Sequence, residues 1–141
     1  LLDLGVFYQN YSSDMSRTIY LGTPGKEEIA RYQLLQDCQS QALQEIKEGK
    51  DFLELDKSVR HKLGKYSSHF IHSLGHGVGL EIHESPSFNQ SQKIQKNQIF
   101  TLEPGIYFYQ KYGIRIEDTL LFDGKVRTLT KSNKELLTFK I

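Results

Sequence analysis

The sequence has little of what membrane-spanning, disulfide-bonded or strongly charged proteins contain. Its single cysteine, Cys38, has no partner for an internal disulfide, and no apolar run approaches the roughly 20 residues that span a bilayer. Neither sign of charge prevails, because 18 basic residues stand against 17 acidic ones. We therefore expect no membrane insertion and no nucleic-acid partner, and a reducing cytoplasm is the expected location.

The residues that are present are typical of one folded domain. With 141 residues, of which 38% are hydrophobic and 25% charged, the chain can bury an ordinary core. The chain starts at Leu1 rather than at a methionine, and chemically important residues follow almost at once. We therefore expect an N-terminally truncated protein, with a trimmed but complete domain as the alternative.

Hydrophobic spacing and turn residues predict the first part of the fold. Residues 1–8 and 16–21 favour β-structure and flank a turn rich in Asn and Ser, which predicts a hairpin. Thr23 and Pro24 are typical of a helix N-cap and first helical position, and this long amphipathic helix should end near Gly49. Its apolar stripe recurs at spacings of three and four and consists of Ile29, Tyr32, Leu35, Cys38, Ala42 and Ile46.

A second, shorter helix is predicted over residues 53–63. Its apolar side chains recur every four residues, and either Asp51 or Asp56 is a suitable N-cap. Gly64 directly after the pattern is a typical helix stop.

The remaining apolar segments predict strands. They cover residues 99–109 with an interruption at Pro104-Gly105, residues 113–122, and residues 126–129 after an Asp-Gly turn. Helices and strands come in blocks rather than in strict alternation. This order favours an α+β fold with a mixed or antiparallel sheet.

Five side chains that are costly to bury lie in apolar or glycine-rich surroundings. They are Asp3, Asp14, His76, Glu103 and Glu117. An unpaired buried charge is expensive, so each of them faces solvent, pairs with a cation or binds a metal. Solvent is the ordinary answer for any one charged residue, so the argument for a site rests on the whole set.

These residues belong to an ordered series of six motifs. The motifs are Asp3-Leu4-Gly5, Ser13 to Thr18, His72 to Gly79, His83 to Pro86, Glu103 to Tyr107 and Gly113 to Asp118. Together they resemble the pita-bread metallopeptidases, a family that includes methionine aminopeptidases, proline dipeptidases, Xaa-Pro aminopeptidases and creatinases. The resemblance implies a mixed, curved sheet with helices on its outer face. It also implies that residues 1–141 are the C-terminal portion of the catalytic domain.

The resemblance further implies two divalent metal ions held by the five residues above. Asp14 and Glu117 would bridge the ions. Asp3 would complete one site, while His76 and Glu103 would complete the other. Oxygen ligands with one imidazole suit Mn²⁺, Co²⁺, Fe²⁺ or Zn²⁺, and Mn²⁺ is our first choice. Two ions about 3.5 to 4 Å apart lower the pKa of a bridging water to yield hydroxide and polarise a substrate carbonyl.

Catalytic roles also follow from the resemblance. Glu103 would carry a proton from the nucleophile to the leaving nitrogen, and His72 and His83 would flank the scissile carbonyl. Arg115 stands two residues before Glu117, on the same strand face, and would orient a ligand carboxylate such as Asp3.

The motif around Glu103 and the run of residues 113–118 favour the proline-specific branch. The substrate would then be a proline-containing peptide, in which the scissile bond is a tertiary amide without an N–H. The alternatives are a methionine aminopeptidase-type enzyme, a non-catalytic protein-binding module with the same fold, and a remnant that works only with a partner fragment. A homodimer is compatible with the family. His61 and His69 match no motif position and receive no role.

Overall fold

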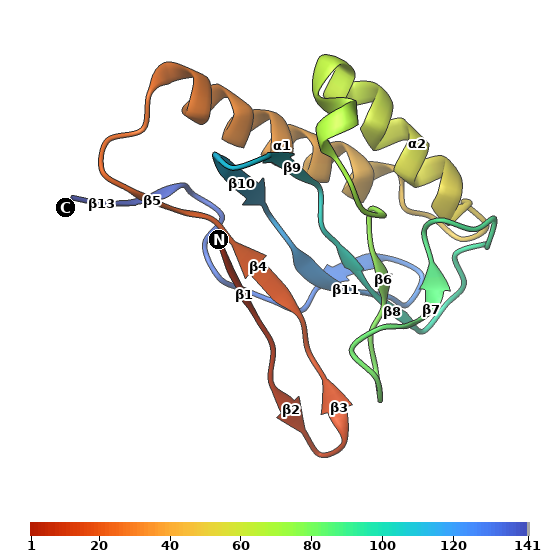
Figure 1. Ribbon diagram of the computed structural model, residues 1–141. Helices are drawn as coiled ribbons and strands as arrows, with labels where there is room; N and C mark the ends of the chain where they lie inside the picture. The colour runs from red at the N-terminus through yellow and green to blue at the C-terminus, as the bar shows by residue number, and fades with distance from the viewer. Residues whose placement is uncertain (141) are drawn as a thin grey trace.

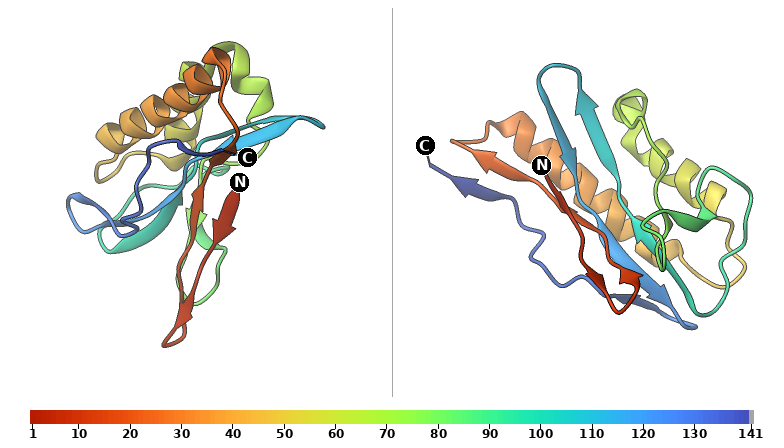
Figure 2. Two further views of the ribbon diagram at one scale, coloured as in Figure 1. Left: turned by 90° about the vertical axis from the view of Figure 1, so that its left-hand side faces the viewer. Right: turned by 60° about the horizontal axis from the view of Figure 1, so that its bottom comes forward.

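The fold consists of two helices lying across one side of a curved β-structure, with a long hairpin projecting from it (Figure 1). The computed structural model describes residues 1–140. The left view of Figure 2 shows the hairpin standing clear of the body, with the N-terminus at its base. Among residues 1–140, no helix is both long and apolar enough to cross a bilayer.

The projecting hairpin confirms the first prediction. Its outer strands pair antiparallel, with Asp3 directly opposite Ser16. At its tip Gln9 and Asn10 adopt positive φ angles, which tight hairpin turns require. After the hairpin the chain forms one further strand, which pairs in parallel with the last strand of the protein. These strands are β1 (Leu2–Leu4), β2 (Phe7–Tyr8), β3 (Tyr11–Ser12), β4 (Met15–Arg17), β5 (Ile19–Leu21) and β13 (Leu137–Phe139).

The long helix α1 (Lys26–Glu45) begins later and ends earlier than predicted. Gly25, not Thr23, is the N-cap residue, and Lys26 rather than Pro24 is the first helical residue. The acidic residues that follow occupy the first turn, where the helix dipole favours negative charge. At the other end Ile46 adopts an extended backbone and turns its side chain into the core.

Most of the predicted apolar stripe of α1 is buried, but Ile29 is 51% exposed. The first turns of α1 extend beyond the strands that the rest of the helix covers (Figure 1). Ile29 lies in the first turn and is therefore left half exposed, although its spacing fits the stripe.

The second helix α2 (Phe52–Leu63) has the predicted ends. Asp51 is the cap, because its carboxylate accepts the Leu53 N–H at 3.0 Å. Asp56 instead accepts the Leu74 N–H at 2.8 Å and so ties the helix to the loop that follows. Gly64 ends α2 with a φ of 54°. It opens a 3₁₀ segment, η1 (Gly64–His69).

The main sheet has five antiparallel strands in the order β12-β11-β8-β6-β7, and β9 and β10 form a separate hairpin. Together with the parallel pair β5 and β13, this makes the strand arrangement mixed, as predicted. The strands are β6 (His76–Gly77), β7 (Glu84–Ser87), β8 (Gln98–Leu102), β9 (Gly105–Phe108), β10 (Tyr112–Arg115), β11 (Asp118–Phe122) and β12 (Val126–Thr128).

The predicted strand over 113–122 is in fact two strands, because the chain changes partner at Ile116 and Glu117. The Ile116 N–H donates to the Pro104 carbonyl at 3.3 Å, and the Glu117 N–H donates to the Ser16 carbonyl at 3.1 Å. Sequence patterns carry no signal for such a change of partner. Its consequence is that Glu117 lies where the hairpin meets the main sheet.

The core lies between the helices and the main sheet. Phe52 of α2 packs against Phe88 and Phe100, with ring centroids 4.6 and 5.1 Å away. All three rings are fully buried, and Leu35 and Cys38 of α1 extend the same core. The site described next therefore rests on a packed foundation on its sheet side.

Candidate metal centre

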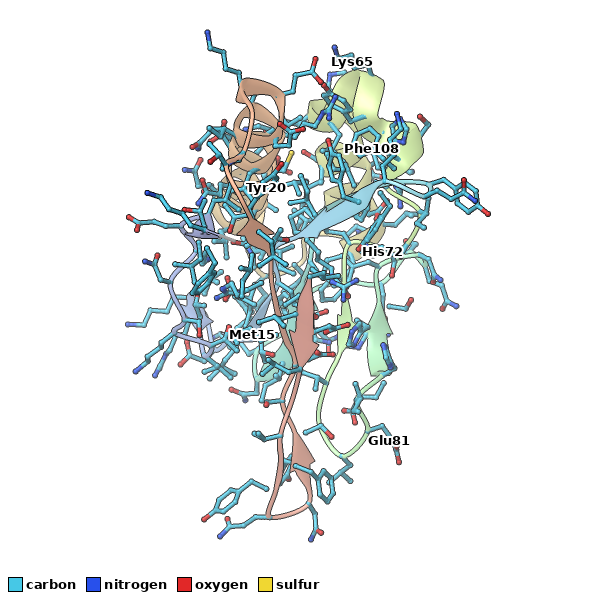
Figure 3. The ribbon with its side chains drawn as sticks, turned by 60° about the vertical axis from the view of Figure 1, so that its left-hand side comes forward. Met15, Tyr20, Lys65, His72, Glu81 and Phe108 are labelled. Carbon is cyan, nitrogen blue, oxygen red and sulfur yellow. The ribbon has the colours of Figure 1, made fainter. Side chains whose placement is uncertain are left out.

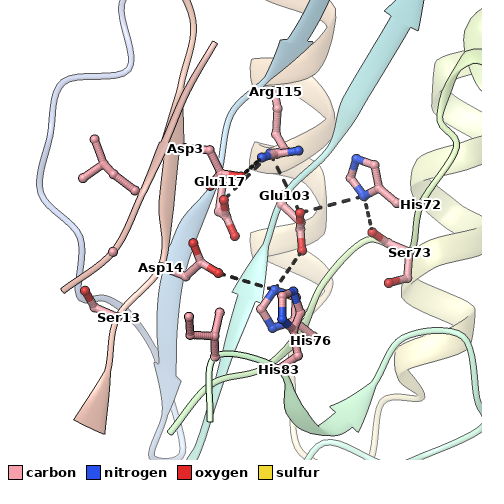
Figure 4. A pocket seen from close by; sticks show the side chains of 13 residues that line it. Asp3, Ser13, Asp14, His72, Ser73, His76, His83, Glu103, Arg115 and Glu117 are labelled. Atoms are coloured by element: carbon pink, nitrogen blue, oxygen red, sulfur yellow. Dashed lines mark hydrogen bonds and ion pairs between the residues drawn. The ribbon is translucent and has the colours of Figure 1, made fainter. Parts of the chain in front are cut away.

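The predicted site residues line one cavity of about 500 Å³ between the hairpin and the main sheet (Figure 4). The view in Figure 3 shows the strand carrying Met15 on one side of this region and the segment carrying His72 on the other. The cavity is lined by all five predicted ligands and by the three residues with predicted supporting roles, His72, His83 and Arg115.

The five ligand candidates come from five different segments. Asp3 lies on β1, Asp14 directly precedes β4, and His76 opens β6. Glu103 directly follows β8 and Glu117 directly precedes β11, two paired antiparallel strands in which Leu102 stands opposite Asp118. The two glutamates therefore lie side by side at the same end of this strand pair.

His76 lies beside two of the acidic residues, Glu103 and Asp14 (Figure 4). Its Nε2 atom is 3.3 Å from Glu103 Oε1 and 3.6 Å from Asp14 Oδ2. Its Nδ1 atom is 3.0 Å from the Gly77 carbonyl, which can only accept, so Nδ1 carries the hydrogen. In the neutral ring Nε2 then presents a lone pair to the cavity, as a metal-ligating histidine does.

The donor atoms are close enough to share an ion. One atom each of Asp14, His76 and Glu117 lie within 4.8 Å of one another. Hard carboxylate oxygens with one imidazole nitrogen are a donor set that first-row divalent metals accept. These three of the five predicted ligands therefore fit a site for a divalent ion.

Burial and like charges make this cluster unfavourable by itself. Burial, together with the Glu103 carboxylate, raises the pKa of Glu117 to about 8. Burial raises the pKa of Glu103 to about 7, although the Arg115 guanidinium opposes the shift. Burial also raises the pKa of Asp14. A divalent cation would relieve this repulsion, so metal binding should stabilise the fold.

The two flanking histidines differ in their surroundings. His72 is half-buried, and burial lowers its pKa, so the ring is neutral near pH 7. Its Nδ1 contacts the Ser73 carbonyl and its Nε2 contacts the Tyr107 hydroxyl, both at 2.8 Å. His83 is exposed, and its ring centroid lies 4.1 Å from that of His76. It is therefore the histidine whose nitrogens an incoming molecule meets first.

Arg115 contacts Asp3, as the resemblance implies. The prediction that Arg115 and Glu117 share one strand face is wrong, because β10 ends at Arg115 and Glu117 precedes β11. Its Nη2 atom donates to Asp3 Oδ2, its Nε atom to Ser16 Oγ at 2.8 Å, and its Nη1 atom to the Tyr107 hydroxyl at 2.9 Å. The same Nε atom lies 3.9 Å from Glu117 Oε2. The Arg115 guanidinium thus lies close to the carboxylates of both Asp3 and Glu117.

Tyr107 is a residue that sequence reasoning missed. Its ring lies over two glycines: a Cβ on Gly105 would come within 2.7 Å of its hydroxyl, and a Cβ on Gly113 within 2.6 Å of its Cδ1 atom. Because Tyr107 and Gly113 are opposite each other on β9 and β10, the signal was present as glycine inside a strand pattern. The hydroxyl thereby reaches His72 and Arg115.

Gln39 was missed because it is a polar residue on the buried side of α1. Its side chain is 2% exposed, and Nε2 donates to the carbonyls of Leu102 and Ile116 at 3.1 and 3.3 Å. These carbonyls belong to the residues directly before the two site glutamates. Gln39 thus fixes the backbone on which both glutamates stand.

The histidines without predicted roles lie outside the cavity. His61 is exposed on α2, and His69 contacts the Tyr107 carbonyl at 3.1 Å from the far side of β9.

The fold and this donor set place the chain among the metallopeptidases of the pita-bread fold. It belongs to metallopeptidase family M24, which matches residues 1–123.

Its relatives include enzymes named for proline. The Xaa-Pro dipeptidase of Pyrococcus furiosus is 41% identical over 142 residues, covering 97% of this chain and 41% of the relative. The prolidase structure from Pyrococcus horikoshii has a TM-score of 0.90 at 40% identity, over 96% of this chain and 40% of that one. The structure of X-Pro aminopeptidase from Thermotoga maritima has a TM-score of 0.91 at 36% identity, over 97% of this chain and 40% of that one. The chain spans about two fifths of the length of these relatives.

Proposed function

We propose that this chain carries the metal-binding and catalytic residues of a peptidase that hydrolyses the Xaa-Pro bond, in dipeptides or at the N-terminus of peptides. The observation that carries the proposal is the convergence of four carboxylates and His76 on one cavity backed by Arg115. The names of the related dipeptidase and aminopeptidase support the choice of the proline branch. We also propose that residues 1–141 are the C-terminal portion of the catalytic domain.

The metal centre would use the ligands predicted from the sequence. Asp14 and Glu117 would contact both ions, Asp3 one of them, and His76 and Glu103 the other, with Mn²⁺ as the first choice of metal. Bound divalent ions supply Lewis acidity, which promotes ionisation of water and polarises a carbonyl.

Glu103 is the residue best placed to move the proton in amide hydrolysis. Its carboxylate lines the cavity, where it can accept a proton from a bound water and release it again. As the water oxygen bonds to the scissile carbonyl carbon, Glu103 accepts a water proton. It then passes the proton to the proline nitrogen as the C–N bond breaks. The products are one free amino acid, which carries the new carboxylate, and either proline or a peptide that begins with proline and carries the new amine.

The neighbouring side chains would hold the substrate and the machinery in place. His83 is exposed at the cavity and would contact the peptide, while His72, bonded to Tyr107, would form the opposite wall. Arg115 would orient Asp3 through the ion pair between them. A cytoplasmic location and a homodimer stay predictions.

The test is metal content and hydrolysis of an Xaa-Pro dipeptide with added Mn²⁺, on the chain and on Glu103→Gln. We expect about two ions per chain, and a rate roughly 10²- to 10⁴-fold lower for the variant, because it loses general acid–base catalysis. The matched control is Glu48→Gln. Glu48 is exposed in the connection between α1 and α2, so this substitution should leave the rate unchanged.

Three results would change the proposal. Equal cleavage of a methionine-alanine dipeptide would favour the methionine aminopeptidase-type alternative. Metal binding without turnover would mean that the chain holds the centre but needs further parts of a catalytic unit, as the remnant alternative states. The absence of bound metal would contradict the ligand assignment and favour the non-catalytic module.

A further inference from the structure

Ser16 lies at the centre of a polar network directly behind the cavity, although it does not line the cavity itself. The residue is fully buried on β4. Its hydroxyl oxygen is 2.5 Å from Glu117 Oε2, 3.0 Å from Asp3 Oδ1 and 2.8 Å from Arg115 Nε. One small side chain therefore contacts two of the proposed ligands and the cation that supports them.

The chemistry of these groups fixes the direction of the hydrogen bonds. A guanidinium can only donate, so the Ser16 oxygen accepts from Arg115. The single hydroxyl hydrogen is then available to the carboxylates, one at a time, and the shorter contact is to Glu117. The hydroxyl thus stands between two acidic groups whose mutual repulsion would otherwise move them.

The backbone of Ser16 holds the same two residues. Its carbonyl accepts the Glu117 N–H at 3.1 Å, so Glu117 is bound to Ser16 through both its main chain and its side chain. Asp3 is its register partner across β1 and β4. Ser16 therefore joins the hairpin to the main sheet at the point where their ligands meet.

We propose that Ser16 is a positioning residue that sets the spacing of Asp3 and Glu117 and thereby the affinity of the chain for divalent ions. This inference rests on the proposed function, because it takes both carboxylates as metal ligands. Without the hydroxyl, the Arg115 Nε–H and the Glu117 carboxylate lose a partner that water cannot replace, since Glu117 is only 1% exposed.

The test is the dissociation constant for Mn²⁺, measured by calorimetric titration of the metal-free protein, for the natural chain and Ser16→Ala. Partners that orient metal ligands typically contribute 10- to 100-fold to affinity, and we expect a weakening in this range. The matched control is Ser58→Ala. The Ser58 hydroxyl donates to the Glu45 carboxylate at 2.6 Å, far from the cavity, so its loss should leave Mn²⁺ affinity unchanged.

A second pair of variants separates positioning from folding. Ser16→Thr and Ser16→Val have the same shape and differ only in the hydroxyl, so any cost of the added methyl group is common to both. Threonine should restore Mn²⁺ affinity to within about threefold, a tolerance small beside the 10- to 100-fold effect, whereas valine should not. Equal affinities in this pair would overturn the proposal, even if Ser16→Ala fails to fold.

The outcomes also distinguish this inference from the proposed function. If the natural chain binds Mn²⁺ and Ser16→Ala binds it equally well, only the positioning role is wrong. If the natural chain itself binds no Mn²⁺, the metal centre is wrong and the positioning role falls with it.

Discussion

The two walls of the cavity are built in different ways. The sheet wall carries Glu103 and Glu117, both buried, at the ends of β8 and β11, whose apolar side chains share one buried core with those of α1 and α2. On the hairpin wall, by contrast, the side chain of Asp3 is 52% exposed, and the flanking Leu2 and Leu4 are exposed as well. Apolar packing therefore fixes the ligands of the sheet wall, whereas those of the hairpin wall are held mainly by polar contacts.

Specific polar contacts bind the hairpin to the body, and the buried ion pair between Arg17 and Asp118 is one of them. Besides the bonds of Ser16, the Ser12 N–H donates to the Gly79 carbonyl at 2.7 Å, and the Thr119 hydroxyl donates to the Asp14 carbonyl at 2.7 Å. The comparison teaches that one cavity can combine a wall of high local stability with a wall whose ligand positions depend on individual hydrogen bonds.

The largest effect is expected in the core beneath the sheet wall. Phe100 of β8 is fully buried against Phe52 and Phe88, so Phe100→Ala removes a ring and leaves a cavity. The free energy of unfolding should fall by about 3–5 kcal/mol, as is typical of buried Phe→Ala substitutions. Urea denaturation followed by circular dichroism measures it. A loss below about 1 kcal/mol would mean that the sheet wall is not the packed side.

A smaller effect is expected from Gln39→Met, which keeps the length of the side chain but removes its hydrogen bonds. The carbonyls of Leu102 and Ile116 then lose a donor in a region closed to water, a change that costs about 1–3 kcal/mol. Gln33→Met, on the exposed face of α1, is the control and should change the unfolding midpoint little. Equal midpoints for the two variants would show that Gln39 does not support the sheet wall.

Much of this sheet wall was readable from the sequence. Leu35, Cys38 and Ala42 lie where helical spacing places them, because an apolar stripe is buried wherever the helix lies against the rest of the fold. Gln39 was not readable, since a buried polar residue is defined by its distant partners. The break between β10 and β11 at Ile116 was not predicted for the same reason, because it depends on which distant strand the backbone pairs with.

In the candidate site, too, some residues could be predicted from local sequence patterns and others could not. Its ligand candidates were found because motifs record which residues carry the chemistry, and the structure brings all of them to one cavity. Ser16 and Tyr107 stand inside those motifs, but Ser16 contacts Glu117 and Tyr107 contacts His72, both far away in the sequence. Local patterns cannot reveal such contacts. The error at Thr23 has a different cause, because Gly25 and the acidic first turn competed for the helix start.

Acid should weaken the body of the protein through Asp51. A hydrogen bond from Ser91, with further ones from Lys93 and the Leu53 N–H, lowers the pKa of this carboxyl to about 2. A lowered pKa in the folded state contributes stability above the unfolded-state value of about 3.9, and this contribution is lost as the pH falls towards 2.

The measurement is the urea midpoint at pH 5 and at pH 2.5, for the natural chain and for Asp51→Asn. The natural chain should lose more of its midpoint between these values, because the asparagine variant has no proton to gain at this position. Asp37→Asn, on the exposed face of α1, serves as the control and should follow the natural chain. Parallel curves for all three proteins would contradict the role of Asp51.

The smallest effect is expected at the tip of the hairpin. Phe7 is 67% exposed, so Phe7→Ala removes little buried surface, and the free energy of unfolding should change by no more than about 0.5 kcal/mol. The same substitution at Phe100 in the core is the matched comparison, and urea denaturation serves for both. A loss above about 2 kcal/mol at Phe7 would mean that the hairpin tip is packed in solution, since a loss of that size requires lost packing. The hairpin would then be held by apolar packing at its tip, and the contrast between the two walls would not hold there.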